Sequence, residues 1–424
     1  MPGANSTRRH FFRKASLLAG LGFVSPLLAE GKFESLFRLE EEDFWREIRQ
    51  AYSASANLIN LNNGGVSPHP KSVQALVDRY TQFANEAPAY YMWRSMGRLR
   101  EGVRRQLADL AGCSMEEIAI QRNATEALEV VIKGLDFPPG SEILTTDQDY
   151  PSILNTLDMR SRRYGIKVNK IALPVPCEDF KEILERFRAA ITPQTKLIVL
   201  CHIINLSGQI LPIKEICDMA HERGIEVLVD GAHSFANLDF KIEELGCDYF
   251  GTSLHKWLSA PFGTGMLYVK KEHISKLWPM YGYPEGEKDK MSKFEHLGTR
   301  SFPIELGIGE AIRFHLGIGT QRKHKRLLYL KKYWTEQLED LEEFHLNTSL
   351  DPTYACGIVN FRLKNWDSGE LGRMLTNKYQ LYNTVSRHKD VEGVRISPHV
   401  YTSLEDLDHL VRTLKKLAKT GPPK

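Results

Sequence analysis

The chain has 424 residues, of which 42% are hydrophobic and 26% are charged. These values match the averages of globular proteins and exclude a disordered, collagen-like or polytopic membrane chain, while the length suits one large domain or two to three ordinary ones. The formal charge is only +3, from 56 Lys and Arg against 53 Asp and Glu, which excludes the concentrated basic surface of a nucleic-acid-binding protein. Residues 1–29 carry four basic residues and no acid, so the rest of the chain has a charge of 3 − 4 = −1.

Residues 1–29 have the pattern of a targeting segment. Arg8 and Arg9 precede Phe11, and an apolar run follows at 15–29, which is shorter than the roughly 20 residues that cross a bilayer. The arginine pair resembles the twin-arginine export signal, an address read by a receptor rather than an anchor. The resemblance implies export by the twin-arginine route to the periplasm or another extracytoplasmic compartment, without a stable membrane anchor. A disordered basic tail is the alternative interpretation.

The segment from residue 30 to about 111 is mostly helical in pattern. Apolar residues at helical spacing predict helices at about 33–56, 71–86 and 96–111, separated by a loop at 57–70 that is rich in Gly and Pro. From about 115 to 270, short apolar runs alternate with helical patterns at 124–134, 178–190 and 213–223, which predicts a parallel sheet covered on both faces. The predicted strands are Ile118–Gln121, Glu142–Thr145, Lys167–Ile171, Lys196–Cys201, Glu226–Asp230, Tyr249–Ser253 and Gly265–Val269.

The remainder of the chain indicates a second, smaller domain. Residues 303–340 form a long helical pattern that could bridge two domains. After it, strands at 357–363 and 394–397 alternate with helices at 369–378 and 404–417, which is typical of a small α+β unit. The expected fold class is therefore α/β, a mostly parallel sheet with helices on both faces plus a smaller α+β C-terminal domain. We divide the chain into a signal segment at 1–29, an N-terminal arm and large domain at 30–320, and a bridging helix and small domain at 321–424.

The six cysteines are scattered and include no CxxC pair, so the sequence predicts neither a metal site nor a redox motif.

The stretch of the sequence that says most about function is 227–269. Asp230 ends one predicted strand and Lys256 follows another, at the strand ends where α/β sheets gather ligand-binding groups. A buried lysine is costly unless it is paired or neutral, but its amine can form a Schiff base. A Schiff-base lysine with an acidic partner for the ring nitrogen characterises pyridoxal-phosphate (PLP) sites.

At these residues the sequence resembles the class V aminotransferase family of fold-type I PLP enzymes. The resemblance covers about residues 58–418, and it is most specific to the isopenicillin-N-epimerase-like group in HKWLSAPFGTGMLYV at 255–269 and GTRSFP at 298–303. It implies a large domain that binds PLP, with three catalytic residues: Lys256 as the Schiff-base lysine, Asp230 at the ring nitrogen and His233 beside the ring.

The resemblance also implies the remaining contacts to cofactor and substrate. Its residues for the phosphate, the ring face and the ring hydroxyl are Ala124, Thr125, Tyr150, Asn205, Ser253 and His255. Thr299, between Gly298 and Arg300, matches a segment that reaches the phosphate of a partner subunit, which implies a homodimer with shared active sites. Arg395 matches the arginine that holds the carboxylate of a small amino-acid substrate, and Asn63 is a further candidate for substrate recognition.

Several reactions remain open on this scaffold. Lys256 could take the Cα proton in each of them. Return of the proton to the cofactor carbon gives transamination, and return to the opposite face of Cα gives epimerisation, which needs a second acid. Loss of a group from the β-carbon would make the protein a β-lyase for a cysteine-like substrate. Desulfuration through a persulfide is disfavoured, because residues 385–391 contain no cysteine and Cys356 lies at the start of a predicted strand. A catalytically silent binding protein is a further alternative, whereas a nicotinamide enzyme lacks its GxGxxG motif.

Overall fold

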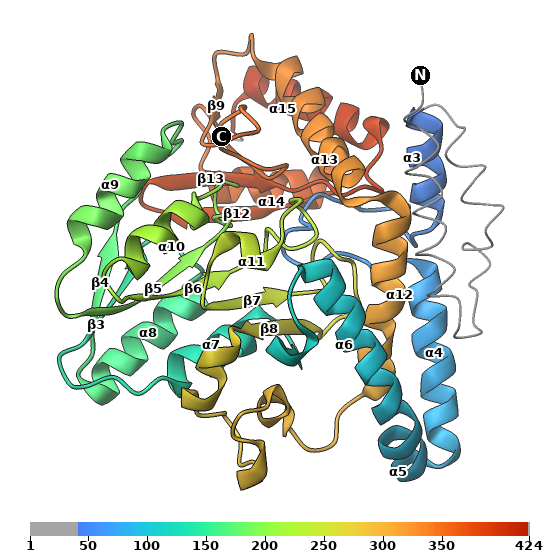
Figure 1. Cartoon of the computed structure of the whole chain (residues 1–424). Helices are drawn as coiled ribbons and strands as arrows, with labels where there is room; N and C mark the ends of the chain where they lie inside the picture. The colour runs from blue at the N-terminus through green and yellow to red at the C-terminus, as the bar shows by residue number, and fades with distance from the viewer. Residues whose placement is uncertain (1–40, 423–424) are drawn as a thin grey trace, which may run out of the picture.

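The computed structural model describes residues 41–422. Its largest element is a seven-stranded sheet in the order β2-β8-β7-β6-β5-β3-β4 (Figure 1). Strand β8 is antiparallel to both of its neighbours, and the other pairs are parallel. The strands lie where the sequence predicts them, within one residue at each end: β2 (Ile118–Gln121), β3 (Glu142–Thr146), β4 (Lys167–Ile171), β5 (Thr195–Cys201), β6 (Glu226–Asp230), β7 (Tyr249–Ser253) and β8 (Gly265–Val269).

Helices cover both faces of this sheet, as predicted. Successive side chains of a strand point to opposite faces. On β5, Leu197 and Val199 belong to one core with helices α7 (Ala124–Gly134) and α8 (Pro151–Tyr164). Ile198 and Leu200 belong to the other core with helices α9 (Phe180–Ala190) and α10 (Ile213–His221). The continuous apolar strands of the sequence therefore reflect burial on two sides.

Three long helices stand side by side at one end of the molecule, where α12 (Phe302–Ile318) contacts α4 (Lys71–Glu86) and α6 (Gly97–Ala111). The predicted helix at 303–340 is in fact two, because the chain turns at Gly319, whose φ of 91° favours glycine, before α13 (Thr320–Thr335). The first predicted helix is observed as α3 (Glu41–Gln50), and the targeting segment at 1–29 lies outside the described residues. Shorter elements are α5 (Pro88–Tyr90), α11 (Ile242–Leu245), η1 (Tyr91–Met96), η2 (Met115–Glu117), η3 (Lys271–Lys276), η4 (Glu285–Glu287), η5 (Met291–Glu295) and η6 (Glu336–Leu338).

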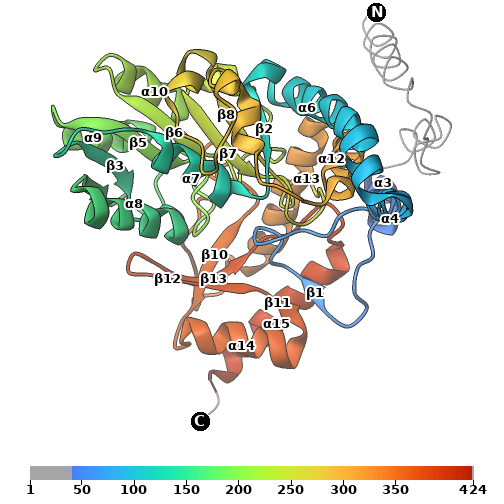
Figure 2. The ribbon, with the colours of Figure 1, turned by 90° about the horizontal axis from the view of Figure 1, so that it is seen from below.

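The C-terminal part forms a second lobe below the large sheet in Figure 2. Its antiparallel sheet has the order β12-β13-β10-β9, and its separate core is built around Trp334 and Phe361. A two-stranded parallel pair joins β1, near the N-terminus, to β11 of this lobe. Among residues 41–422, no helix is both long and apolar enough to span a bilayer. The elements are β1 (Ile59–Asn60), β9 (Phe344–Leu346), β10 (Val359–Leu363), α14 (Ser368–Tyr379), β11 (Leu381–Tyr382), β12 (Thr384–His388), β13 (Val391–Ile396) and α15 (Leu404–Thr420).

Candidate active site

A cavity of about 770 Å³ lies where the C-terminal lobe faces the ends of the large sheet. Its floor comes from the carboxyl ends of the parallel strands, which is the place where open α/β sheets bind ligands. Its other wall comes from β12, β13 and the loop that follows β1. The two lobes and the N-terminal segment therefore build one site together.

Lys256 and Asp230 face each other across this floor, because β6 and β7 are neighbouring parallel strands. Asp230 is only 6% exposed, and its Oδ1 accepts a hydrogen bond from the Ala232 N–H at 2.9 Å. Burial raises the pKa of Asp230 to about 6, against the opposing effect of the Lys256 ammonium. Burial likewise lowers the pKa of Lys256 to about 8, against the opposing effect of Asp230. The neutral, nucleophilic amine is therefore far more populated near neutral pH than it is in a free lysine.

Two rings border the lysine amine. His233 Nε2 lies 3.4 Å from Lys256 Nζ, and the centre of the Tyr150 ring lies 5.7 Å from the same atom. Burial lowers the pKa of His233 well below its usual value, and the positive charges of Lys256 and Arg395 lower it further. His233 is therefore neutral in this site, as expected for an imidazole beside a cation.

The start of α7 forms an anion-binding cradle. Asn123 caps this helix by accepting the Glu126 N–H at 2.8 Å, and the Ala124 N–H donates to Ser253 Oγ at 2.9 Å. A Cβ atom on Gly265 would lie 2.6 Å from the Asn123 backbone, so glycine is what lets β8 pass so close to the helix start. A helix N-terminus with hydroxyl groups beside it suits a phosphate. Thr125 and His255 line the same part of the cavity.

Arg395 is a buried cation without an acidic partner among the described residues. It is 6% exposed, and its Nη1 and Nη2 donate to the Asn205 carbonyl and to Asn62 Oδ1, both at 2.8 Å. Its Nε and the Asn205 Oδ1 are buried with no hydrogen-bond partner. Burial lowers the pKa of Arg395 to about 10. Unpaired buried charges are costly, so the cavity is built for a ligand that carries an anion and further polar groups.

Of the predicted site residues, Ala124, Thr125, Tyr150, Asn205, Asp230, His233, Ser253, His255, Lys256 and Arg395 all line this one cavity. The expectation for Asn63 is corrected, because its side chain is 0% exposed and its amide donates to the carbonyls of Asn60 and Ser397. Its neighbours Asn62 and Gly64 line the cavity instead. Thr299 is exposed and does not line the cavity of its own chain, so its expected place in a partner's site stays a prediction.

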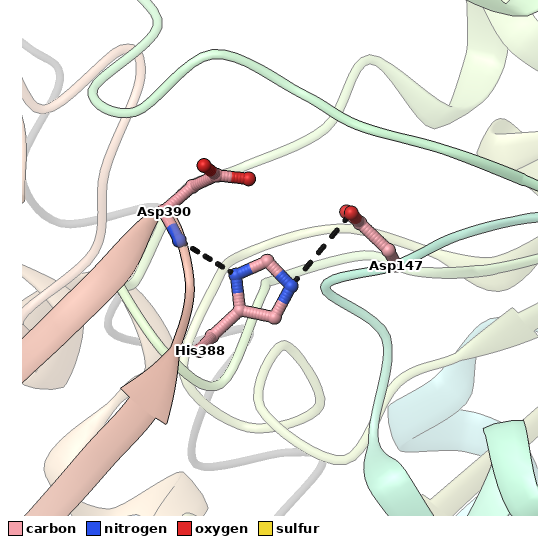
Figure 3. Close-up of side chains that lie close together, drawn as sticks. All are labelled: Asp147, His388 and Asp390. Carbon is pink, nitrogen blue, oxygen red and sulfur yellow. Dashed lines mark hydrogen bonds and ion pairs between the residues drawn. The ribbon is translucent and has the colours of Figure 1, made fainter.

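The C-terminal lobe adds a group that the sequence reasoning missed. In Figure 3, His388 at the end of β12 faces Asp147, which follows β3, with 3.8 Å between Nε2 and Oδ2. The Asp390 N–H donates to His388 Nδ1 at 3.3 Å. The spacing of Asp147, His388 and Asp390 would fit a metal ion, but the Lys389 ammonium already lies 3.0 Å from the Asp147 carboxylate. These contacts join the β12–β13 hairpin to the rim of the cavity.

A cysteine nucleophile is absent from the described cavity wall on the β12–β13 side, where Ser386 and His388 stand. Cys201 lines the floor, but it is 2% exposed. Burial and the carboxylates of Asp149 and Asp230 raise its pKa well above its usual value, so it is a thiol rather than a reactive thiolate. Cys356 is fully buried in the core, three residues before β10 begins, so it is a core thiol as expected.

A family model for class V aminotransferases matches residues 59–410. The chain belongs to this family. An isopenicillin N epimerase from Streptomyces clavuligerus is 30% identical over 390 residues, which cover 88% of this chain and 98% of the relative. A probable cysteine desulfurase from Halalkalibacterium halodurans is 28% identical, with 85% and 93% covered. The expected resemblance to the epimerase-like group is thus confirmed.

Solved structures confirm the fold. A C-DES variant with glycine covalently linked to its PLP cofactor has a TM-score of 0.77 at 22% identity, with 86% of this chain and 98% of that chain covered. The expected cofactor, PLP, is confirmed by membership of the class V aminotransferase family. The cavity also fits the group, since it offers a helix N-terminus for a phosphate, a buried carboxylate for a ring nitrogen and an orphaned amide oxygen at Asn205.

Proposed function

We propose that the protein is a PLP-dependent enzyme that acts at Cα of an amino acid through Lys256, as an aminotransferase or an epimerase. The observation that carries this proposal is the arrangement of Lys256, Asp230 and the unpaired Arg395 around one cavity. When bound, PLP supplies an electron-withdrawing ring that delocalises the charge left on Cα after the proton departs. The 30% identity to an isopenicillin N epimerase favours epimerisation over transamination. Both reactions begin with the removal of the Cα proton.

The chain's own residues have separate tasks in this reaction. Asp230 would keep the ring nitrogen protonated, and the start of α7 with Ser253 would hold the phosphate. Arg395 orients the substrate carboxylate with a two-point fork. Lys256 Nζ, with its pKa lowered to about 8, removes the Cα proton and carries it, because a base near neutral pKa does so most effectively.

A β-lyase for a cysteine-like substrate is the second candidate. It is supported by the desulfurase relative together with the lack of a nucleophilic cysteine at the described cavity wall, since a lyase that releases its product directly needs none. Elimination begins with the same loss of the Cα proton to Lys256. It differs from transamination and epimerisation in its next step, in which a group leaves the β-carbon.

A panel of amino acids in deuterated water tests the function. We expect exchange of the Cα proton for one class of substrate, and no exchange with the Lys256→Ala variant. Keto acid, inverted Cα configuration, or ammonia with pyruvate then distinguishes transaminase, epimerase and lyase. Exchange that persists in Lys256→Ala, or its absence across the panel with PLP bound, contradicts the proposal.

We also propose a homodimer with shared sites, supported by the exposed Gly298–Thr299 segment that resembles a phosphate-reaching loop. Light scattering should give twice the chain mass, and a fully active monomer would contradict the homodimer.

We further propose export by the twin-arginine route, on the basis of Arg8 and Arg9. Replacing both with lysine should abolish export of the folded protein, and unchanged export would remove this claim.

A further inference from the structure

Trp257, directly after the catalytic lysine, contacts the histidine beside that lysine. Its indole Nε1 lies 3.3 Å from His233 Nδ1, while His233 Nε2 lies 3.4 Å from Lys256 Nζ. Trp257 is fully buried, and His233 is 4% exposed. The three side chains form a short chain of contacts from the core to the cavity.

The chemistry of the indole decides which ring nitrogen of His233 carries hydrogen. An indole N–H is only a donor, so Nδ1 must offer its lone pair. A neutral imidazole has one N–H, which then lies on Nε2. A protonated imidazolium would place two N–H groups against each other at Nδ1. The burial of His233 and the positive charges nearby also favour the neutral ring.

Trp257 is itself held in place from several sides. Its ring stacks on His399, with centroids 5.8 Å apart and planes 15° apart. Its carbonyl accepts a hydrogen bond from the buried Lys323 ammonium of α13. His399 Nε2 lies 3.4 Å from Ser259 Oγ in the same turn. The indole therefore cannot turn its N–H away from His233 without disrupting the core.

We propose that Trp257 is a positioning residue that fixes His233 as the tautomer with hydrogen on Nε2. His233 then presents a donor to the cavity and to the Lys256 amine, and it cannot accept a proton at the atom that faces the reaction. This gives His233, expected only to lie beside the ring, the specific role of a hydrogen-bond donor. A donor directed at the lone pair of Nζ stabilises the neutral amine and so helps to keep Lys256 reactive.

The test replaces the indole by a ring that lacks the donor. In Trp257→Phe, Nδ1 loses its fixed partner, and Nε2 becomes free to accept from the lysine ammonium. Heteronuclear NMR of the full chain with isotope-labelled histidine reports which nitrogen carries hydrogen, and loss of the signal in His233→Gln assigns it. The pH dependence of acylation of Lys256 in the cofactor-free chain reports the lysine pKa. Trp334→Phe, the same change at a buried tryptophan of the other lobe, is the control.

The expected result is an unprotonated Nδ1 in the unmodified chain and in Trp334→Phe, and a changed tautomer with a raised Lys256 pKa in Trp257→Phe. Hydrogen on Nδ1 of the unmodified chain overturns the proposal, and this measurement stands even where Trp257→Phe fails to fold. Unchanged tautomer and unchanged lysine titration in a folded Trp257→Phe overturn it as well. Because these measurements need no cofactor, they are independent of the proposed reaction.

Discussion

Replacing Arg395 by lysine tests how the cavity recognises its substrate. A guanidinium has five N–H donors, and two of them are used by Asn62 and the Asn205 carbonyl, so three remain and two of these can hold a carboxylate. A lysine keeps the positive charge but cannot make a planar two-point fork. The loss of one hydrogen bond to a charged group costs about 1.5–3 kcal/mol. Since about 1.4 kcal/mol corresponds to a factor of ten, Arg395→Lys should lower kcat/KM by about 10- to 150-fold.

The assay compares kcat/KM for the amino acid that the panel identifies with kcat/KM for its primary carboxamide. The carboxamide has no negative charge and only one acceptor oxygen, so it cannot bind both N–H groups of the guanidinium. The kcat/KM values of Arg395→Lys and of the unmodified enzyme for the carboxamide should therefore differ by less than about threefold, or about 0.7 kcal/mol. Arg362→Lys, on the exposed side of the neighbouring strand β10, is the matched control and should behave as the unmodified enzyme. The cofactor spectrum and the thermal midpoint of each variant report whether the fold is intact.

An equal loss on the acid and the amide would refute the reasoning, because Arg395 would then act only through the packing of Asn62 and Asn205. A full rate on the acid in Arg395→Lys would refute it too, since the fork would have no role.

Three further predictions follow from the same cavity. Asp230→Ala should keep part of the cofactor absorbance but lose about 100-fold or more in turnover, and near-normal rates would exclude Asp230 from the reaction. The rate at which the cofactor-free chain captures PLP should rise with pH through about 8, because burial lowers the pKa of Lys256 to that value and only the neutral amine attacks; a rate that is flat between pH 6 and 10 contradicts this. Gly265→Ala places a Cβ 2.6 Å from the Asn123 backbone, so it should weaken PLP binding or folding by about 1–3 kcal/mol, whereas Gly282→Ala, which has open space around it, should change neither.

The parallel sheet could be predicted because its signal is local. Each of its strands is a short apolar run between helical patterns, and burial on both faces leaves no polar alternation to confuse the pattern. Strand β12 has the sequence TVSRH and is only partly buried, so only its pairing with β13 identifies it. The turn at Gly319 was missed for a similar reason, because the residues on both sides continue a helical pattern.

The site residues that could be predicted are those that lie at or just after the end of a strand with a clear apolar pattern. Asp230 ends one strong strand and Lys256 follows the next, and the pairing of these two strands brings them together. The loop after β1 shows the limit. A bridge between Asn62 and Ser397 fixes its register, and this long-range contact, which no local pattern reports, turns Asn63 into the core and Asn62 toward the cavity. The contact between Asp147 and His388 is missed for the same reason.

The central claim is that the Lys256 amine carries the cofactor. Reduction of the holoenzyme with borohydride, followed by proteolysis and mass spectrometry, identifies the lysine that is covalently bound to PLP. We expect one modified peptide, which contains Lys256, and no modification in Lys256→Ala. Modification of another lysine, or a cofactor that is lost entirely after reduction, would contradict it.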